Sequence, residues 1–466
     1  MDRRRFLQAL GATGVATATA GCGGLLPDED RTTTEPPADR SPASSPTADA
    51  TETPAAAGEY ADRFETVVDL SAVGADTDAE RSVVPLLEEH LADDTLVYLP
   101  KGRYLVDDTV RHLSFDNVGL VGDGAVIVPP EGFDDPFFDF GRAGQASNLL
   151  IDGLAFDFRA ADAGSRPVSA LVDDGLLIRD LTVAGTQSLG SGMLRTDVTS
   201  PEGKGLVERL RLPDGAVRDT SSNGCLVGDD HRGELRFADC LIVGFPDNGL
   251  YADPLRGRVE VVGGYYANSD ISNVRVGNDS VVRGVHVRND AAPDGYENMR
   301  GIRLTHGDGV RVEDCTIELR TVSGSGGAIT LGDRLVSGTV RDTDIRVDAD
   351  GINGIRAKPP LGDTPTGGTI TFDSVTIRGS AATRSAMEIS GRSDCVIDDC
   401  SIVQSGRDRN GVRFVSDSGG TIRNTRFDVT GTPIVTGTQS SVRVVDSFPA
   451  GLNTDDSDPP ADGNRR

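Results

Sequence analysis

A short phrase that recurs every two to three dozen residues constrains this chain more than any other feature. The phrase reads apolar, any, Asp/Gly/Asn/Ser, small or apolar, any, apolar, as at residues 151–156, 178–183 and 312–317. Its copies start at residues 151, 178, 207, 237, 261, 282, 312, 340, 372, 397 and 422. A strand this short cannot bury a face alone, so successive copies must stack into parallel sheets around a continuous apolar interior.

A second phrase follows most copies, typically Gly or Asn and then a strand of period two. It is found at residues 248–253, 273–276, 301–304, 354–357, 387–389 and 411–414. Each coil therefore holds at least two strands. The consensus of a leucine-rich repeat is missing, and a propeller would need about 40 residues per blade. The sequence predicts an all-β, right-handed, single-stranded parallel β-helix of about 11–13 coils.

The entry to the repeat carries a resemblance to a known family. Residues 69–78, a helical stretch to about Leu91, and residues 96–104 and 117–124 resemble the N-terminal entry of the pectate lyase and polygalacturonase superfamily. The resemblance implies a short helix that caps the open end of the β-helix and shields its edge strands. Pro85 lies inside this stretch, so the helix either kinks or begins there.

The two ends of the chain have other compositions. Arg3, Arg4 and Arg5, followed by an apolar run that ends at Gly21-Cys22, resemble a twin-arginine export signal joined to a lipobox. The resemblance implies residues 1–22 as a signal, a lipid on Cys22, and a protein exported and held on the cell surface. We expect a disordered Thr/Pro/Ala/acidic linker at 23–59, the β-helix at 60–450 and a disordered acidic tail at 451–466.

The charge of the chain restricts its environment and partners. Asp plus Glu number 73 and Lys plus Arg 46, a formal charge of −27, and lysine occurs only as Lys101, Lys204 and Lys358. Molar salt shortens the Debye length to roughly 3 Å and screens the self-repulsion of such a chain. The pattern indicates a halophilic, haloarchaeal type of secreted protein. The negative charge argues against nucleic acid as a partner, and a monomer is expected.

The second phrase predicts an outward-facing column of side chains. If the residue after its Gly points inward, the next residue points outward, in stacked strands about 4.8 Å apart. The predicted column consists of Tyr251, Arg275, Arg303, Thr330, Arg356, Glu388 and Arg413. Guanidinium groups suit carboxylate and sulfate. One interpretation is a groove for an acidic polysaccharide or cell-envelope glycan, with Tyr251 against a sugar ring and Arg275, Arg303, Arg356, Lys358 and Arg413 as further binding residues. The other is that these arginines pair with carboxylates of neighbouring coils.

Candidate catalytic residues flank the same strands. Hydrolysis of a glycoside uses a carboxylic acid and a second carboxylate, and the candidates here are Asp253, His306 and Asp230. Gly228-Asp229-Asp230, His306-Gly307 and Arg356-Ala357-Lys358 resemble polygalacturonase motifs in order but not in spacing. Asp230 and His306 fall three coils apart, roughly 14 Å, which is too far for direct proton transfer.

Two alternatives to hydrolysis stay open. Elimination would use Arg303 or Arg275 as a base beside a carboxylate neutralised by Ca²⁺ or Arg. Asp229, Asp230 and Asp253 are the candidate calcium ligands. A non-catalytic surface protein for adhesion or cell-envelope organisation is the second function class, because one fold hosts both uses.

The remaining motifs are minor. Cys225, Cys240, Cys315, Cys395 and Cys400 form an odd set without metal-ligand spacing, typical of small buried hydrophobic residues. The sequon at residues 278–280 predicts a glycan on Asn278 in an exposed turn.

Overall fold

The computed structural model describes residues 55–449, apart from 161, 189, 191 and 366. The chain divides into two units, residues 1–52 and 53–466, and the description below concerns the second. The predicted signal, the Cys22 lipidation site, the linker up to residue 54 and the acidic tail lie outside the described residues. Among those residues, no helix is both long and apolar enough to span a membrane.

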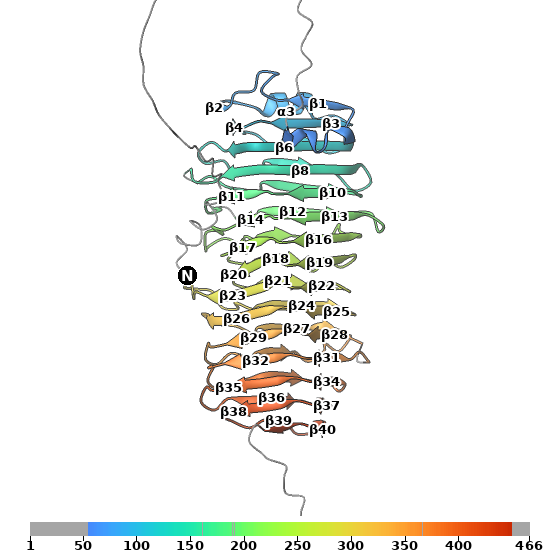
Figure 1. The fold of residues 1–466 in the computed structure, drawn as a ribbon, viewed down its shortest axis with the longest axis vertical. Helices are drawn as coiled ribbons and strands as arrows, with labels where there is room; N and C mark the ends of the chain where they lie inside the picture. Colours follow the sequence, from blue (N-terminus) through green and yellow to red (C-terminus); the bar gives the residue numbers. More distant parts are fainter. Residues whose placement is uncertain (1–54, 161, 189, 191, 366, 450–466) are drawn as a thin grey trace, which may run out of the picture. The chain divides into compact units, whose positions relative to one another are not determined.

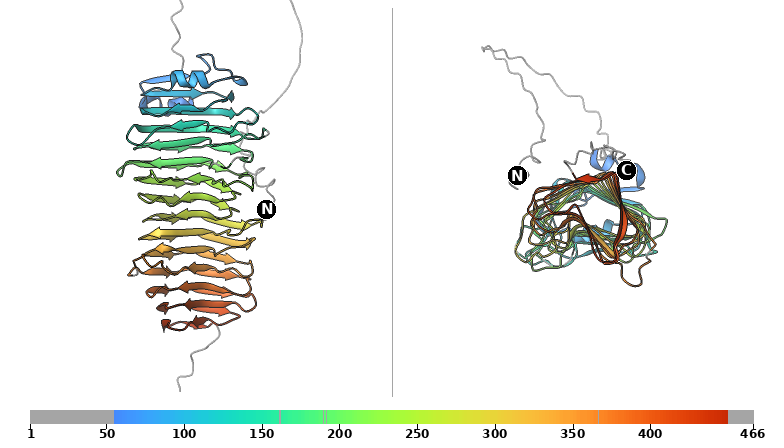
Figure 2. Two further views of the ribbon diagram at one scale, coloured as in Figure 1. Left: turned by 180° about the vertical axis from the view of Figure 1, so that it is seen from behind. Right: turned by 90° about the horizontal axis from the view of Figure 1, so that it is seen from below.

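The predicted parallel β-helix is confirmed, with coils stacked one on another along the molecule (Figure 1). Each coil carries three strands, one more than the minimum that the sequence indicated. One strand per coil belongs to a 13-stranded parallel sheet, here called sheet B. The other two belong to a 28-stranded sheet, here called sheet A, whose strands form two files. The view along the stack shows the coils superposed around a common interior (Figure 2).

The strands of sheet B are β5 (Val110–His112), β7 (Phe138–Phe140), β9 (Val168–Val172), β12 (Leu194–Val198), β15 (Cys225–Leu226), β18 (Asn248–Ala252), β21 (Ser272–Val276), β24 (Ile302–Gly307), β27 (Ile329–Leu335), β30 (Ile355–Ala357), β33 (Ser385–Ser390), β36 (Asn410–Val415) and β39 (Ile434–Thr436).

File 1 of sheet A consists of β1 (Thr66–Asp69), β3 (Thr95–Leu99), β10 (Leu176–Arg179), β13 (Lys204–Glu208), β16 (Glu234–Ala238), β19 (Arg258–Val262), β22 (Val281–Arg283), β25 (Val310–Glu313), β28 (Gly338–Arg341), β31 (Ile370–Asp373), β34 (Cys395–Asp398), β37 (Gly419–Arg423) and β40 (Ser441–Val445).

File 2 consists of β2 (Asp78–Ser82), β4 (Gly102–Leu105), β11 (Thr182–Ala184), β14 (Arg211–Leu212), β17 (Leu241–Val243), β20 (Tyr265–Ala267), β23 (His286–Asp290), β26 (Thr316–Thr321), β29 (Asp344–Val347), β32 (Thr376–Gly379), β35 (Ser401–Gln404), β38 (Arg426–Val429) and β41 (Phe448–Pro449). The long strands β6 (Phe115–Val128) and β8 (Ala146–Asp157) run through both files.

The register of file 1 follows the sequence repeat residue by residue. The first positions of successive phrases pair directly in neighbouring strands, from Ile151 with Ile178 to Ile397 with Ile422. The intervening pairs continue the same line through residues 207, 237, 261, 282, 312, 340 and 372. Each copy of the phrase is therefore one coil.

The third position of the phrase forms a bend between file 1 and file 2. Asp180, Asp314 and Asp399 have positive φ values of 51°, 53° and 49°. Gly153 and Gly284 stand at the same point of other coils, with φ of 70° and 64°. Left-handed backbone is costly for most L-residues but accessible to Gly, Asp and Asn. This requirement explains why the phrase selects Asp, Gly, Asn or Ser there.

The interior of the coils is one continuous apolar core. It extends from Leu70 to Phe427 and is filled by side chains of all three strand sets. The five cysteines within the described residues are buried and free. Cys240 and Cys315 follow the bend residue directly, and their thiols donate to Ala238 O at 3.5 Å and to Glu313 O at 3.1 Å. Burial raises the pKa of Cys240 to about 12, so this thiol is an inert core group.

The predicted helix begins at the proline. Helix α3 (Val84–His90) has Pro85 in its first turn, where a missing N–H costs nothing, and lies at the N-terminal end of the stack (Figure 1). Ahead of it come α2 (Ala55–Gly58) and a 3₁₀ turn, η1 (Ala61–Arg63). Ala57 and Tyr60 are buried against the outer face of file 1, together with Leu96 and Leu150. Packing therefore starts a few residues before the expected boundary at residue 60, because these two side chains cover apolar groups of the sheet.

Candidate functional site

The predicted outward column lies in one register line on sheet B. Tyr251 pairs with Arg275, Arg275 with Arg303 and Arg303 with Thr330. The line continues through Arg356, Glu388 and Arg413. The residues on either side of these positions, such as Leu250 and Ala252, are buried in the core. The column side chains therefore project away from the interior.

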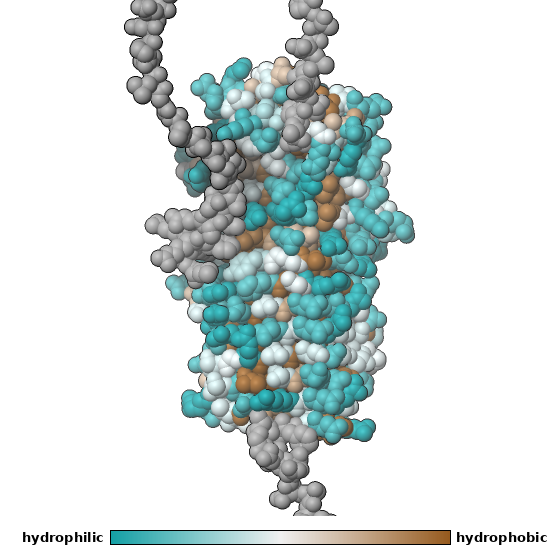
Figure 3. Space-filling model, in the orientation of Figure 1, coloured by the Kyte–Doolittle hydropathy of each residue, from teal (hydrophilic) through white to brown (hydrophobic). Residues whose placement is uncertain are grey.

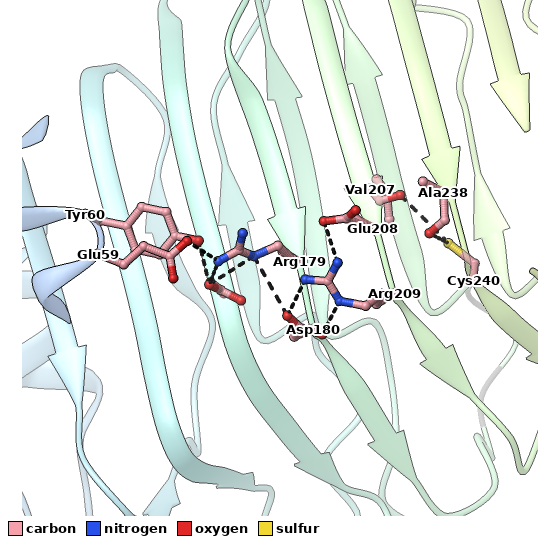
Figure 4. A network of polar contacts seen from close by, with 10 residues as sticks. Glu59, Tyr60, Arg179, Asp180, Val207, Glu208, Arg209, Ala238 and Cys240 are labelled. Atoms are coloured by element: carbon pink, nitrogen blue, oxygen red, sulfur yellow. Dashed lines mark hydrogen bonds and ion pairs between the residues drawn. The ribbon is translucent and has the colours of Figure 1, made fainter. Parts of the chain in front are cut away.

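On sheet A, arginines and carboxylates of neighbouring coils form ion pairs. Arg179 contacts Asp152 at 2.9 Å, and Arg209 contacts Asp180 and Glu208, each at 2.7 Å, in a network that crosses several coils (Figure 4). Further along file 1, Arg423 contacts Asp398 at 2.7 Å. On this face most of the arginines are matched by carboxylates, whereas Lys204, Arg211, Arg236, Arg426 and Arg443 make no ion pair within the described residues.

On sheet B, only part of the positive charge of the predicted column is matched. Arg275 contacts Asp253 at 2.7 Å and Arg356 contacts Glu388 at 3.3 Å. Arg303, Lys358 and Arg413 make no ion pair with any residue of the described part of the chain. Ion pairing thus accounts for two of the predicted binding residues and leaves three without a carboxylate.

A further cation, which the sequence analysis did not single out, joins this group. Arg300 directly precedes β24 and makes no ion pair among the described residues. Burial, and then the neighbouring Arg303, lower the pKa of Arg300 to about 10. Burial, followed by Arg303 and Arg300, also lowers the pKa of Lys358. We call Arg300, Arg303 and Lys358 the unpaired cation cluster.

Next to this cluster, the structure brings Asp253 and His306 together. The carboxylate of Asp253 is 4 % exposed and bonds to Arg275, whose guanidinium carbon lies 4.1 Å from the centre of the Tyr251 ring. His306 Nδ1 lies 4.0 Å from Asp253 Oδ2. Burial raises the pKa of Tyr251, so this phenol is neutral at ordinary pH. An aromatic ring, a guanidinium group, a carboxylate and an imidazole thus meet at three successive strands, β18, β21 and β24.

The imidazole of His306 occupies a space that a glycine leaves open. A side chain on Gly277 would place its Cβ 2.7 Å from His306 Cε1. His306 Nε2 lies 3.3 Å from the carbonyl oxygen of Pro254, which also accepts a bond of 2.8 Å from Asn278 Nδ2. Nε2 of the imidazole thus faces a carbonyl oxygen, and Nδ1 faces the carboxylate of Asp253.

Asp230 lies apart from these residues. Its carboxylate bonds to Arg195 at 2.9 Å, and Arg195 also bonds to Asp197 at 2.9 Å. Asp230 follows β15 and His306 lies in β24, which places them three strands apart in sheet B, as the sequence spacing predicted. Of the three candidate catalytic residues, the structure therefore brings two together.

The carboxylates considered as calcium ligands do not form a calcium site. Ca²⁺ takes six to eight oxygen ligands from a converging set. Asp253 is bonded to Arg275 and Asp230 to Arg195, on different strands. Among the described residues, no three His, Cys, Asp or Glu side chains are grouped to hold a metal ion. These two carboxylates are bonded to arginines rather than grouped for a metal ion.

The sequon serine is not in an exposed position. Ser280 is fully buried, and its hydroxyl accepts a bond of 3.0 Å from Val259 N. Asn278 Nδ2, the atom that would carry a glycan, donates to Pro254 O. Glycosylation at Asn278 remains a prediction, and it would require this contact to open.

This chain was compared with known protein families, sequences and structures. No family model and no curated protein sequence matches the chain. Among solved structures, it is similar to the A-module of the Azotobacter vinelandii mannuronan C-5 epimerase AlgE4, with 13 % identity, a TM-score of 0.49, and coverage of 80 % of this chain and 99 % of that one. The Streptococcus pneumoniae surface adhesin PfbA gives 15 % identity, a TM-score of 0.45 and coverage of 82 % and 100 %.

A third similar structure is tailspike protein 3 of bacteriophage CBA120, with 12 % identity, a TM-score of 0.49 and coverage of 85 % of this chain and 63 % of that one. At this level of identity the likeness concerns the fold alone.

Proposed function

We propose that sheet B binds an acidic polysaccharide, with the unpaired cation cluster as its centre. The observation that carries the proposal is that three partly buried cations, Arg300, Arg303 and Lys358, act on one another and make no ion pair within the described residues. In a chain with 27 excess negative charges, matching carboxylates are abundant. A cluster of cations without them has room for the carboxylates or sulfates of a ligand.

Binding to polysaccharides of different charge tests this proposal. The full chain is titrated with polygalacturonate and with a neutral galactan, at the lowest KCl concentration at which it stays folded. Replacing Arg303 and Lys358 by Gln is expected to weaken polygalacturonate binding by roughly tenfold or more, because charge-assisted hydrogen bonds are lost.

The matched control replaces Arg320 and Arg346 by Gln, which changes the net charge equally. These arginines bond to Glu318 and Asp348 on file 2, each at 2.6 Å. The control is expected to bind like the wild type. Equal affinity of the wild type for both polymers, or an equal loss in both double variants, would contradict the proposal.

Cleavage of the bound polysaccharide is a second proposal, favoured by the contact between Asp253 and His306. A carboxylate, an imidazole and a phenol beside a cation cluster provide proton donors and acceptors next to a held sugar acid. Neither hydrolysis nor elimination is favoured by the geometry over the other. A surface protein that binds without cleaving is the alternative.

Product analysis separates these two outcomes. Unsaturated products and new reducing ends are measured after incubation with polygalacturonate. Asp253→Ala and His306→Ala are each expected to lower the rate about 100-fold or more. Asp230→Ala, in the turn after β15, is expected to leave the rate unchanged. Binding without any product would eliminate cleavage and favour the adhesion or envelope role.

Surface attachment completes the proposal and depends on the sequence alone. We expect the exported chain to partition with membranes through a lipid on Cys22. Cys22→Ser is expected to release it into the medium, and an unchanged membrane fraction would contradict lipidation.

A further inference from the structure

Two buried polar atoms without partners face one spot beside the unpaired cation cluster. Arg300 Nε and Thr330 Oγ1 have no hydrogen-bond partner, and Thr330 is 1 % exposed. A side chain on Gly326 would place its Cβ 3.0 Å from Arg300 Nε and 3.4 Å from Thr330 Oγ1. The two donors therefore converge on the side of Gly326 where a side chain is missing.

The orientation of Arg300 is fixed by its other nitrogens. Nη1 donates to Ile271 O at 3.0 Å and Nη2 to Asn298 Oδ1 at 2.7 Å. Nε is the one guanidinium nitrogen of Arg300 that has no acceptor. Arg303, the register neighbour of Thr330, also has a buried Nε without a partner. Three donors of neighbouring residues thus lack an acceptor within one patch of sheet B.

The positive charges around this patch favour binding of an anion. Arg275 and Arg356 flank it but are bonded to Asp253 and Glu388. Asp270 and Asp333 are the remaining carboxylates that act on Arg300, Arg303 and Lys358. Neither lies within ion-pair distance of these three cations. Buried donors are normally satisfied, and an oxyanion would satisfy these.

We propose that Arg300 Nε and Thr330 Oγ1 form an oxyanion subsite that binds one oxygen of a sugar carboxylate or sulfate half-ester, with Arg303 and Lys358 beside it. The inference rests on the proposed polysaccharide binding and assigns its anchoring point. Residues 323–327, Ser-Gly-Ser-Gly-Gly, run past the two donors. Since both donor atoms are buried, entry of the ligand oxygen requires this segment to move, which its three glycines facilitate.

Two variants test the subsite without changing any charge. Thr330→Val removes the hydroxyl and keeps the shape, and Gly326→Ala directs a methyl group at both donors. Each is expected to weaken binding of the charged polymer about tenfold. Thr339→Val, in file 1 of sheet A, is the matched control and is expected to bind like the wild type. Thermal unfolding checks that all three variants are folded.

The ligands are polygalacturonate, a sulfated galactan and a neutral galactan. Tighter binding of the first or the second by the wild type, lost in both variants, supports the subsite and identifies the group as carboxylate or sulfate. If neither charged polymer binds better than the neutral one, the proposed function fails and the subsite with it. If the charged polymer binds and needs Arg303 and Lys358, but tolerates Thr330→Val and Gly326→Ala, only the subsite is overturned.

Discussion

At the scale of single residues, the left-handed bends decide which amino acids the repeat tolerates. Asp314 has a φ of 53° and joins β25 to β26. Asp314→Val is expected to destabilise the fold by about 1–2 kcal/mol, because a β-branched residue is strained there. Asp314→Gly is the control and is expected to cost much less. Thermal unfolding measures both, and equal effects of the two substitutions would show that the bend does not impose this selection.

The same bends explain why the sequence predicts the coil but not its three-strand division. In the phrase at residues 178–183, Ile178, Leu181 and Val183 are buried. The step of three between the first two breaks the period-two alternation at Asp180. The spacing of apolar residues predicts the repeat and its register. The bend that divides each phrase into two short strands shows only in the backbone dihedral angles.

A buried histidine gives the fold a pH dependence. His231 is fully buried: its Nδ1 accepts from Val198 N at 3.1 Å and its Nε2 lies 3.3 Å from Arg258 O. Burial lowers its pKa to about 4. The unfolded chain, with a pKa of about 6.5, takes up the proton first as pH falls. Stability is therefore expected to fall by about 1.4 kcal/mol per pH unit between these two values.

Unfolding of wild type and His231→Asn at pH 7, 6 and 5 measures this contribution. In His231→Asn, the free energy of unfolding is expected to fall less steeply as the pH decreases, whatever its value at pH 7. His286→Asn, at a half-exposed position on file 2, is expected to keep the wild-type slope. Identical slopes in all three proteins would contradict a role for His231.

At the scale of elements, the ion pairs of sheet A connect neighbouring strands. The buried carboxylate of Glu313 lies 3.3 Å from the Nε of Arg283 and of Arg341, and 3.7 Å from that of Arg311. Glu313→Gln leaves three guanidinium groups around a neutral amide and is expected to cost about 1–3 kcal/mol.

Thermal unfolding again provides the measurement for this element. The control is Glu234→Gln, also in file 1, whose carboxylate makes no ion pair within the described residues. An equal loss of stability in Glu234→Gln and Glu313→Gln would contradict a stabilising role for the ion pairs of Glu313.

For the candidate site, the alternation in sheet B strands predicted the column from Tyr251 to Arg413, and the coil count predicted that Asp230 and His306 lie apart. The sequence did not predict which arginines are paired, because pairing depends on side-chain direction across coils. Nor did it single out Arg300, which precedes its strand, or the burial of Thr330, which follows from the segment beside it.

At the scale of the whole molecule, the charge predicts a requirement for salt. Hydrophilic residues cover much of the visible surface (Figure 3), and the chain carries a formal charge of −27. The Debye length falls from about 10 Å at 0.1 M salt to about 3 Å at 1 M. The unfolding temperature is therefore expected to rise with KCl over this range. An uncharged osmolyte is the control, and a temperature that is independent of KCl would contradict a halophilic design.

The central claim, that sheet B holds an acidic glycan at its unpaired cations, is tested most directly by a crystal structure of the chain with an oligogalacturonate. The account predicts the sugar on the outer face of β21, β24, β27 and β30, with a carboxylate bonded to Arg303. An oligosaccharide bound on sheet A, or on sheet B away from Arg300, Arg303 and Lys358, would contradict it.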